Sequence, residues 1–141
     1  MTRNGTIGLA AALLLAGCGK PAALAVDHAW VRLPAVPGRP AAAYFTLHGG
    51  AADATLIAVA TPAARVAELH ESDAGGMRPL PSVPVPAEGV AAFAPGGRHV
   101  MLIEPDPRLT PGKQVALRLS FADGRTLDTQ ATVVGAADPA P

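Results

Sequence analysis

The chain has 141 residues and carries 11 basic and 11 acidic side chains, so its formal net charge at neutral pH is zero. A balanced charge without a lysine or arginine cluster gives no basis for binding nucleic acid or an anionic lipid surface. Cys18 is the only cysteine, which excludes an intrachain disulfide and a metal site built from several thiolates.

The N-terminus predicts export. Residues 1–17 combine a basic start at Arg3 with an apolar run over residues 7–16, which is too short to span a bilayer. The run ends in Leu15-Ala16-Gly17-Cys18, which resembles the bacterial lipobox, where the cysteine is acylated and becomes the new N-terminus. We therefore expect a lipoprotein signal peptide over 1–17, lipidation of Cys18, a tether over 18–25 and membrane attachment through lipid alone. An ordinary signal peptide with a stray cysteine, or a non-cleaved anchor, remains the alternative.

Short apolar runs then alternate with glycine and proline turn signals, a pattern typical of all-β proteins. Strands are predicted at residues 26–33, 42–48, 55–60, 65–71, 77–80, 90–93, 98–104, 115–121 and 125–134. The proline-rich stretch 81–86 is expected to be an exposed edge or loop. No stretch supports an amphipathic helix, because prolines interrupt the alanine-rich runs. These strands predict one β-sandwich or small barrel over residues 26–134, followed by a disordered tail at 135–141.

Two histidines and two methionines follow a spacing that suits a soft metal ion. His70 is followed after six residues by Met77, and twenty-one residues further on come His99 and Met101 in a His-x-Met pair. Because side chains alternate faces along a strand, His99 and Met101 are expected to share one face, about 7 Å apart. Imidazole and thioether suit Cu(I) and do not suit Mg, Ca or Mn. Taken singly, His70 reads as an exposed polar residue and Met77 as a core filler, whereas together the four residues predict a metal site.

Several stretches resemble the periplasmic copper chaperones of the PCuAC family. The matching stretches are Ala29-Trp30-Val31-Arg32, Ala42-Ala43-Tyr44-Phe45-Thr46-Leu47, Glu68-Leu69-His70-Glu71, Met77-Arg78-Pro79, Pro84-Val85-Pro86 and Pro95-Gly96-Gly97-Arg98-His99-Val100-Met101-Leu102. The resemblance implies a cupredoxin-like Greek-key β-sandwich that binds Cu(I) through His70, Met77, His99 and Met101. The interval between His70 and Met77 is shorter than the roughly ten residues of the family, and the additional methionines that many members carry there are absent.

The resemblance further implies a monomeric, lipid-anchored periplasmic chaperone that is not an enzyme. Its expected role is to pass Cu(I) to the dinuclear copper centre of cytochrome c oxidase, alone or with a Sco-type thiol protein. Two other functions stay open: copper buffering or resistance without a dedicated partner, and a metal-free scaffolding lipoprotein. The sequence contains no Gly-x-Ser-x-Gly elbow, His-Glu-x-x-His motif or glycine-rich phosphate loop that would indicate an enzyme.

Other metal sites fit the residues less well. A blue-copper site needs a cysteine thiolate beside two histidines, and the only cysteine lies in the lipobox. A zinc site using His70, His99 and either Glu68 or Glu71 would leave both methionines unexplained. The remaining histidines, His28 and His48, are expected to be surface residues. The aromatic residues are expected to pack in the core or at its edge; they are Trp30, Tyr44, Phe45, Phe93 and Phe121.

Overall fold

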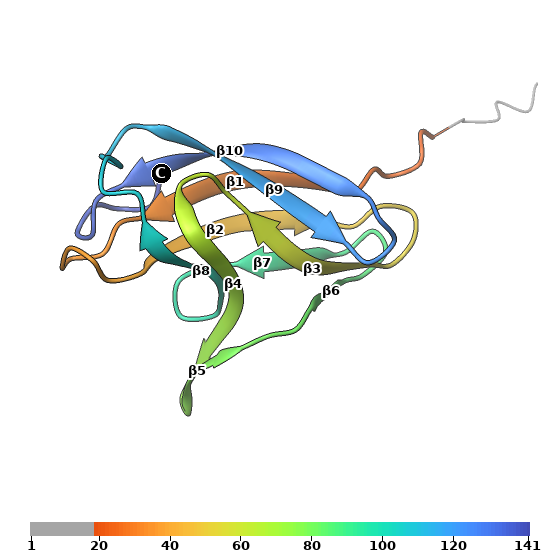
Figure 1. The fold of residues 1–141 in the computed structure, drawn as a ribbon. Helices are drawn as coiled ribbons and strands as arrows, with labels where there is room; N and C mark the ends of the chain where they lie inside the picture. Colours follow the sequence, from red (N-terminus) through yellow and green to blue (C-terminus); the bar gives the residue numbers. More distant parts are fainter. Residues whose placement is uncertain (1–18) are drawn as a thin grey trace, which may run out of the picture.

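In the computed structural model, residues 19–141 are described, and they contain ten strands and no helix (Figure 1). The strands are β1 (Ala25–Arg32), β2 (Ala41–His48), β3 (Ala54–Ala60), β4 (Ala64–Asp73), β5 (Gly76–Pro79), β6 (Val83–Val85), β7 (Val90–Phe93), β8 (Arg98–Pro105), β9 (Gln114–Phe121) and β10 (Thr126–Val134). The all-β prediction is confirmed. Within this part of the chain, no helix is long and apolar enough to cross a membrane. The expected signal peptide and Cys18 lie outside the described residues.

The strands form one hydrogen-bonded series in the order β5-β4-β8-β2-β1-β10-β9-β3-β6, with β7 added beside β2. Among these pairs, β1 and β10 run parallel and the others antiparallel. The two ends of the series, β5 and β6, are consecutive in the sequence. The chain therefore brings both edges of the sheet back to neighbouring residues as the strands curl around a common core (Figure 1).

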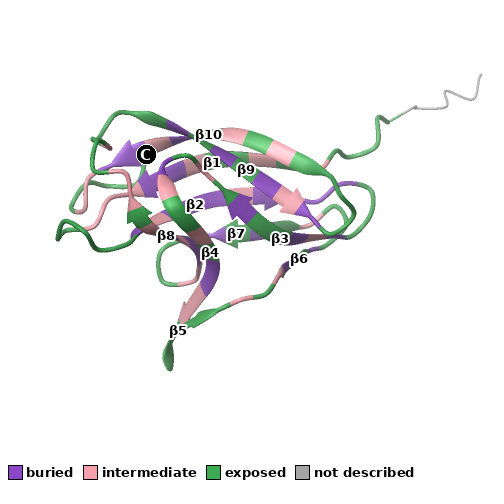
Figure 2. Cartoon of the chain, viewed as in Figure 1, coloured by how far each residue is buried: buried purple, intermediate pink, exposed green. Residues whose placement is uncertain are grey.

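Alternation of buried and outward-facing residues, which is clearest in β9, builds this core. In β9, Val115, Leu117, Leu119 and Phe121 are buried, whereas Arg118 faces solvent (Figure 2). The buried side chains of β9 join those of β2, β3, β7 and β8 in a single apolar cluster. Burial of apolar side chains at about 25 cal/mol per Å² is the main stabilising contribution to such a fold.

A second, smaller cluster lies on the opposite face of the sheet. Val100 and Leu102 of β8 point into the main core, so the alternating positions His99 and Met101 point outward. On the neighbouring strands, Trp30 and Tyr44 pack with Val134 apart from the main core, their ring centroids 4.5 Å apart. The expectation of core packing is confirmed for the three phenylalanines, whereas Trp30 and Tyr44 occupy this outer cluster.

Two segments differ from the prediction. The proline-rich stretch contains the edge strand β6, in which Val83 and Val85 are fully buried and only Pro84 faces outward. The stretch is therefore an edge, as expected, but its valines are not exposed. The sequence predicts disorder from residue 135, whereas the structure places residues 135–138 in a turn held by Arg32, which donates hydrogen bonds to the carbonyl oxygens of Ala136 (3.0 Å) and Asp138 (2.7 Å).

Substitutions at two adjacent positions of β8 should differ in their effect on stability, because one side chain lies in the main core and the other on the outer face. Leu102→Ala removes a fully buried side chain and should lower the free energy of unfolding by about 2–5 kcal/mol. Met101→Leu keeps size and apolarity on the outer face and should cost less than about 1.5 kcal/mol. Chemical denaturation of the metal-free protein measures both. Equal losses would contradict the assignment of the two positions to opposite faces.

Candidate metal centre

Three neighbouring strands bring the four predicted ligands together. His70 of β4 and His99 of β8 are direct cross-strand partners, and Met101 lies two residues further along β8. Met77 belongs to β5 and pairs with Ser72, two residues beyond His70 on β4. Pairing partners and positions two residues apart share a face of the sheet, so all four side chains lie on the outer face.

The ring of His99 presents an unprotonated nitrogen to a sulfur atom. Its Nδ1 lies 3.0 Å from the carbonyl oxygen of Gly97, and because a carbonyl only accepts hydrogen bonds, Nδ1 carries the proton and donates. The other nitrogen, Nε2, lies 3.2 Å from the Sδ atom of Met77. A thioether has no proton to donate, so in the neutral ring protonated at Nδ1 two lone-pair donors face each other. Bonds of about 2.0–2.3 Å from both atoms to one ion would place the donors about 3–4 Å apart, and the observed separation fits that range.

His70 contains a buried nitrogen without a partner. Its Nε2 lies 3.0 Å from Oε2 of Glu68, and an ionised carboxylate only accepts, so Nε2 donates its proton. The remaining nitrogen, Nδ1, is buried and lacks a hydrogen-bond partner among the described residues. Leaving such an atom unsatisfied costs about 1–3 kcal/mol. A metal ion would satisfy it, and a histidine that donates its other N–H to a carboxylate is the usual arrangement of a metal ligand.

Aromatic rings close one side of the site. The rings of His70 and His99 lie 5.9 Å apart, and Tyr44 lies 6.4 Å from His99 on the side away from His70's strand. Tyr44 in turn contacts Trp30, over which the Arg32 guanidinium lies at 4.9 Å. Burial raises the pKa of Tyr44, so its phenol stays neutral at physiological pH. Trp30 and Tyr44, the aromatic pair, keep water from this flank.

A hollow of about 450 Å³ opens beside the two methionines, lined by Arg39, Pro40, Ala41, Ala42, Met77, His99 and Met101. His70 lies next to this hollow through its pairing with His99 rather than in its wall. The histidines are buried, at 9% exposure for His70 and 7% for His99, Met101 is half-buried, and Met77 is 53% exposed. The site is therefore accessible from the side of Met77.

A two-residue turn accounts for the short interval between His70 and Met77. Asp73 pairs with Gly76 across β4 and β5, so Ala74 and Gly75 form the turn, and the Asp73 carboxylate accepts a hydrogen bond of 2.7 Å from the Gly75 amide. Gly76 adopts a φ of +114°, which side chains with a Cβ rarely allow. The shorter loop thus becomes a tight hairpin that sets Met77 opposite Ser72.

The carboxylates do not complete a hard-ligand site. Among residues 19–141, no group of three or more histidine, cysteine, aspartate or glutamate side chains is arranged to hold a metal ion. Glu71 is instead paired with Arg78 and, at 3.7 Å, with Arg98, and its hydrogen bond raises the pKa of Arg78. Glu68 contacts the Nε2 atom of His70 instead, so neither carboxylate of the zinc alternative joins His70 and His99 in a metal-binding group.

The other two histidines lie elsewhere. The Asp27 carboxylate lies 2.8 Å from Nδ1 of His28 and 3.0 Å from Nε2 of His48, and hydrogen bonding to the two rings lowers the pKa of the Asp27 carboxyl. His28 is exposed and sits at a bulge of β1, with a φ of +49°. His28 is thus a surface residue, as expected, whereas His48 is half-buried at the end of β2, beside Gly49.

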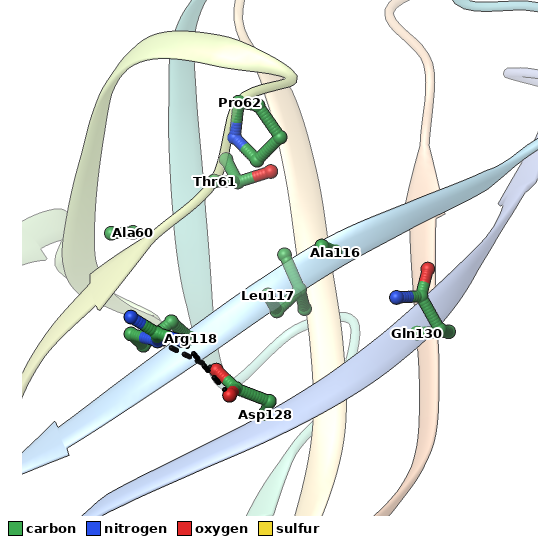
Figure 3. Close-up of a pocket in the computed structure, with 8 residues that line it drawn as sticks. All are labelled: Ala60, Thr61, Pro62, Ala116, Leu117, Arg118, Asp128 and Gln130. Atoms are coloured by element: carbon green, nitrogen blue, oxygen red, sulfur yellow. Dashed lines mark hydrogen bonds and ion pairs between the residues drawn. The ribbon is translucent and has the colours of Figure 1, made fainter.

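A second hollow, of about 490 Å³, lies where β9 and β10 meet the turn between β3 and β4 (Figure 3). Its charged side chains, Arg118 and Asp128, already pair with each other at 2.7 Å, as the dashed lines in Figure 3 show. None of its lining residues is a soft metal ligand. The outer face of β4, β5 and β8 is therefore the candidate metal centre.

The sequence did not indicate the role of Glu68. From the sequence, Glu68 is expected only as a possible zinc ligand, whereas in the structure its carboxylate lies 3.0 Å from Nε2 of His70, a contact that favours the tautomer protonated at Nε2. The available signal is its spacing: residues 68 and 70 are two apart on one predicted strand, so their side chains share a face.

The chain is similar in sequence to one family of lipoproteins. The model of the family described as "Putative lipoprotein LpqE-like" matches residues 24–133. The protein named "Putative lipoprotein Lxx21020" of Leifsonia xyli subsp. xyli (strain CTCB07) is 32% identical over 106 residues, and the match covers 72% of this chain and 63% of that protein. The chain thus spans less than two thirds of the length of this relative.

Solved structures of similar shape are PCuAC domains. The copper-bound PCuAC domain from PmoF2 has a TM-score of 0.68 and 21% identity, covering 82% of this chain and 97% of that one. The solution structure of CuI-DR1885 from Deinococcus radiodurans has a TM-score of 0.64 and 30% identity, covering 84% and 80%. These similarities confirm the predicted fold class, a cupredoxin-like β-sandwich.

Removing the Glu68 carboxylate should release the tautomer of His70. In the wild-type protein without metal, His70 should carry its proton on Nε2, and Glu68→Ala should yield a mixture of tautomers because the acceptor is lost. Glu68→Gln retains an acceptor oxygen and should preserve the wild-type state. Nitrogen-detected NMR of the imidazole rings measures this, with Glu71→Ala as the control that leaves His70 unchanged. A mixture already present in the wild type would contradict the assignment.

Proposed function

Because this chain belongs to the LpqE-like lipoprotein family and has the fold of PCuAC domains, we propose that it is a lipid-anchored copper chaperone. It binds one Cu(I) ion through the Nδ1 atom of His70, the Nε2 atom of His99 and the thioether sulfurs of Met77 and Met101. The ion is cargo, bound and then passed on, and the protein performs no chemical reaction on it.

The observation that carries this proposal is the approach of the Met77 Sδ atom to the Nε2 atom of His99 at 3.2 Å, while Nδ1 of the same ring faces the Gly97 carbonyl. Imidazole nitrogen and thioether sulfur are both ligands of soft metal ions, so two such atoms at this separation can bind one Cu(I) ion together. The orphaned Nδ1 atom of His70 supports the same conclusion from the neighbouring strand.

The ligand set suits Cu(I) in an exported protein. Two imidazoles and two thioethers are soft ligands, and Cu(I) prefers them over the carboxylates that Mg, Ca and Mn select. Thioethers carry no proton, so copper binding at the methionines releases none, and they cannot form disulfides in an oxidising compartment. The similar structures include the copper-bound PCuAC domain from PmoF2 and the Cu(I) form of DR1885.

The destination of the copper belongs to the proposal as well. The chaperone works in the periplasm and delivers Cu(I) to the dinuclear copper centre of cytochrome c oxidase, alone or with a Sco-type protein. The experiment mixes the copper-loaded protein with the cytochrome c oxidase subunit that holds the dinuclear copper centre. A chaperone would transfer its copper to this subunit, whereas a buffering protein would keep it.

Anaerobic titration with Cu(I) against a competing chelator should give one bound ion per protein. Met77→Leu and Met101→Leu should each weaken binding by at least about tenfold, which corresponds to about 1.4 kcal/mol, because each removes one ligand at nearly constant size. Trp30, the only tryptophan, lies beside Tyr44 and offers a fluorescence readout. His28→Ala and His48→Ala serve as controls with unchanged affinity. X-ray absorption should show a mixed N/S shell, and a shell of N and O alone would refute the site.

The lipid anchor is tested separately. Cys18 ends the lipobox-like sequence, so its replacement by alanine should leave an uncleaved precursor or release soluble protein from the membrane fraction. Mass spectrometry of the purified wild-type protein should find acyl chains on Cys18 as the first residue. A mature N-terminus elsewhere, without acyl chains, would contradict the prediction.

A further inference from the structure

We infer that Met77 is the exchangeable ligand of the site, the position through which copper enters and leaves, and that a partner protein takes this position with a soft sulfur ligand of its own. The inference rests on the proposed function and adds the direction and order of copper transfer.

Exposure separates Met77 from the other three ligands. Its side chain is 53% exposed, whereas both histidines are buried and Met101 is half-buried. An incoming ligand can therefore reach the coordination position of Met77 without moving another ligand.

The strands that carry the four ligands also differ in how many neighbouring strands they pair with. β4 is paired with β5 and β8, and β8 with β4 and β2, so His70, His99 and Met101 lie on strands with a neighbour on each side. β5 is the last strand of the series, pairs with β4 alone, and has four exposed residues. Segments with few buried contacts and one row of backbone hydrogen bonds open at the lowest free energy. Met77 is thus the ligand that can withdraw while the other three stay in place.

The surroundings leave one open approach. The aromatic pair, Trp30 and Tyr44, covers the flank of His99, and the main core lies beneath β8. On the remaining side, the hollow beside Met77 and Met101 opens to solvent past Arg39 and Pro40. A partner ligand has to arrive from this side, where Met77 stands at the rim.

The exchange step is balanced without redox chemistry. The bond between copper and the Met77 sulfur breaks as a bond between copper and the partner's sulfur forms, and copper remains Cu(I) throughout. A partner thioether brings no proton, whereas a partner thiol loses its proton to solvent as it binds. Each later bond, to Met101, His99 or His70, breaks in the same way as a further ligand of the partner binds the ion in its place, so the copper is never left without ligands.

Rescue of two matched variants by a small thioether tests this inference. Met77→Ala and Met101→Ala each remove one sulfur ligand, and dimethyl sulfide is added as the replacement. We expect both variants to bind Cu(I) at least about tenfold more weakly than the wild type. Dimethyl sulfide should restore the affinity of Met77→Ala by about tenfold, because that position opens to solvent, and should change Met101→Ala by less than about twofold.

Transfer rates give a second, independent measurement. In stopped-flow mixing of the copper-loaded protein with excess bicinchoninate, Met77→Ala should lose its copper at least about tenfold faster than Met101→Ala at the same chelator concentration. Equal rates, or rescue of both variants or of Met101→Ala alone, would overturn the inference. Failure of the wild-type protein to bind Cu(I) would instead refute the proposed function, so the two failures can be told apart.

Discussion

The alternation of side chains along β8 is the constraint on which the rest of this structure depends. Val100 and Leu102 are fully buried in the main core, so the strand cannot rotate or slip without exposing them, and His99 and Met101 are thereby directed to the opposite face. The same register pairs His99 with His70 across to β4. Apolar burial on one side of the sheet thus holds the candidate ligands in place on the other.

Hydrogen bonds then determine which ring nitrogen of each histidine is free to bind a metal ion. The Gly97 carbonyl accepts the Nδ1 proton of His99, and the Glu68 carboxylate accepts the Nε2 proton of His70, so the two rings offer different nitrogens. These hydrogen bonds also fix the orientation of each ring, so the ligands lose little conformational entropy when the ion binds. The aromatic pair beside them excludes water on one flank and leaves the other flank open.

The copper carrier that we propose has to bind its cargo selectively and still release it, and the architecture would divide these two tasks between strands. The buried histidines and Met101 sit on strands paired on both edges, whereas Met77 sits on the terminal strand of a protruding hairpin. The tight two-residue turn fixes where Met77 lies but adds no second row of hydrogen bonds to β5. Selectivity therefore comes from the interior of the sheet, and release from its edge.

The sequence by itself determined the all-β class, nearly every strand, and the His-x-Met pair on one strand face, because strand alternation and turn residues are local properties. It did not reveal the ordered strand in the proline-rich stretch, whose buried Val83 and Val85 depend on pairing with β3. Only the tertiary structure decided that His70 lies opposite His99, that Glu68 holds the ring of His70, and that Trp30 and Tyr44 leave the main core to flank the site. Those relations join residues from different strands or depend on how side chains orient, and both are set by the register that the buried core selects.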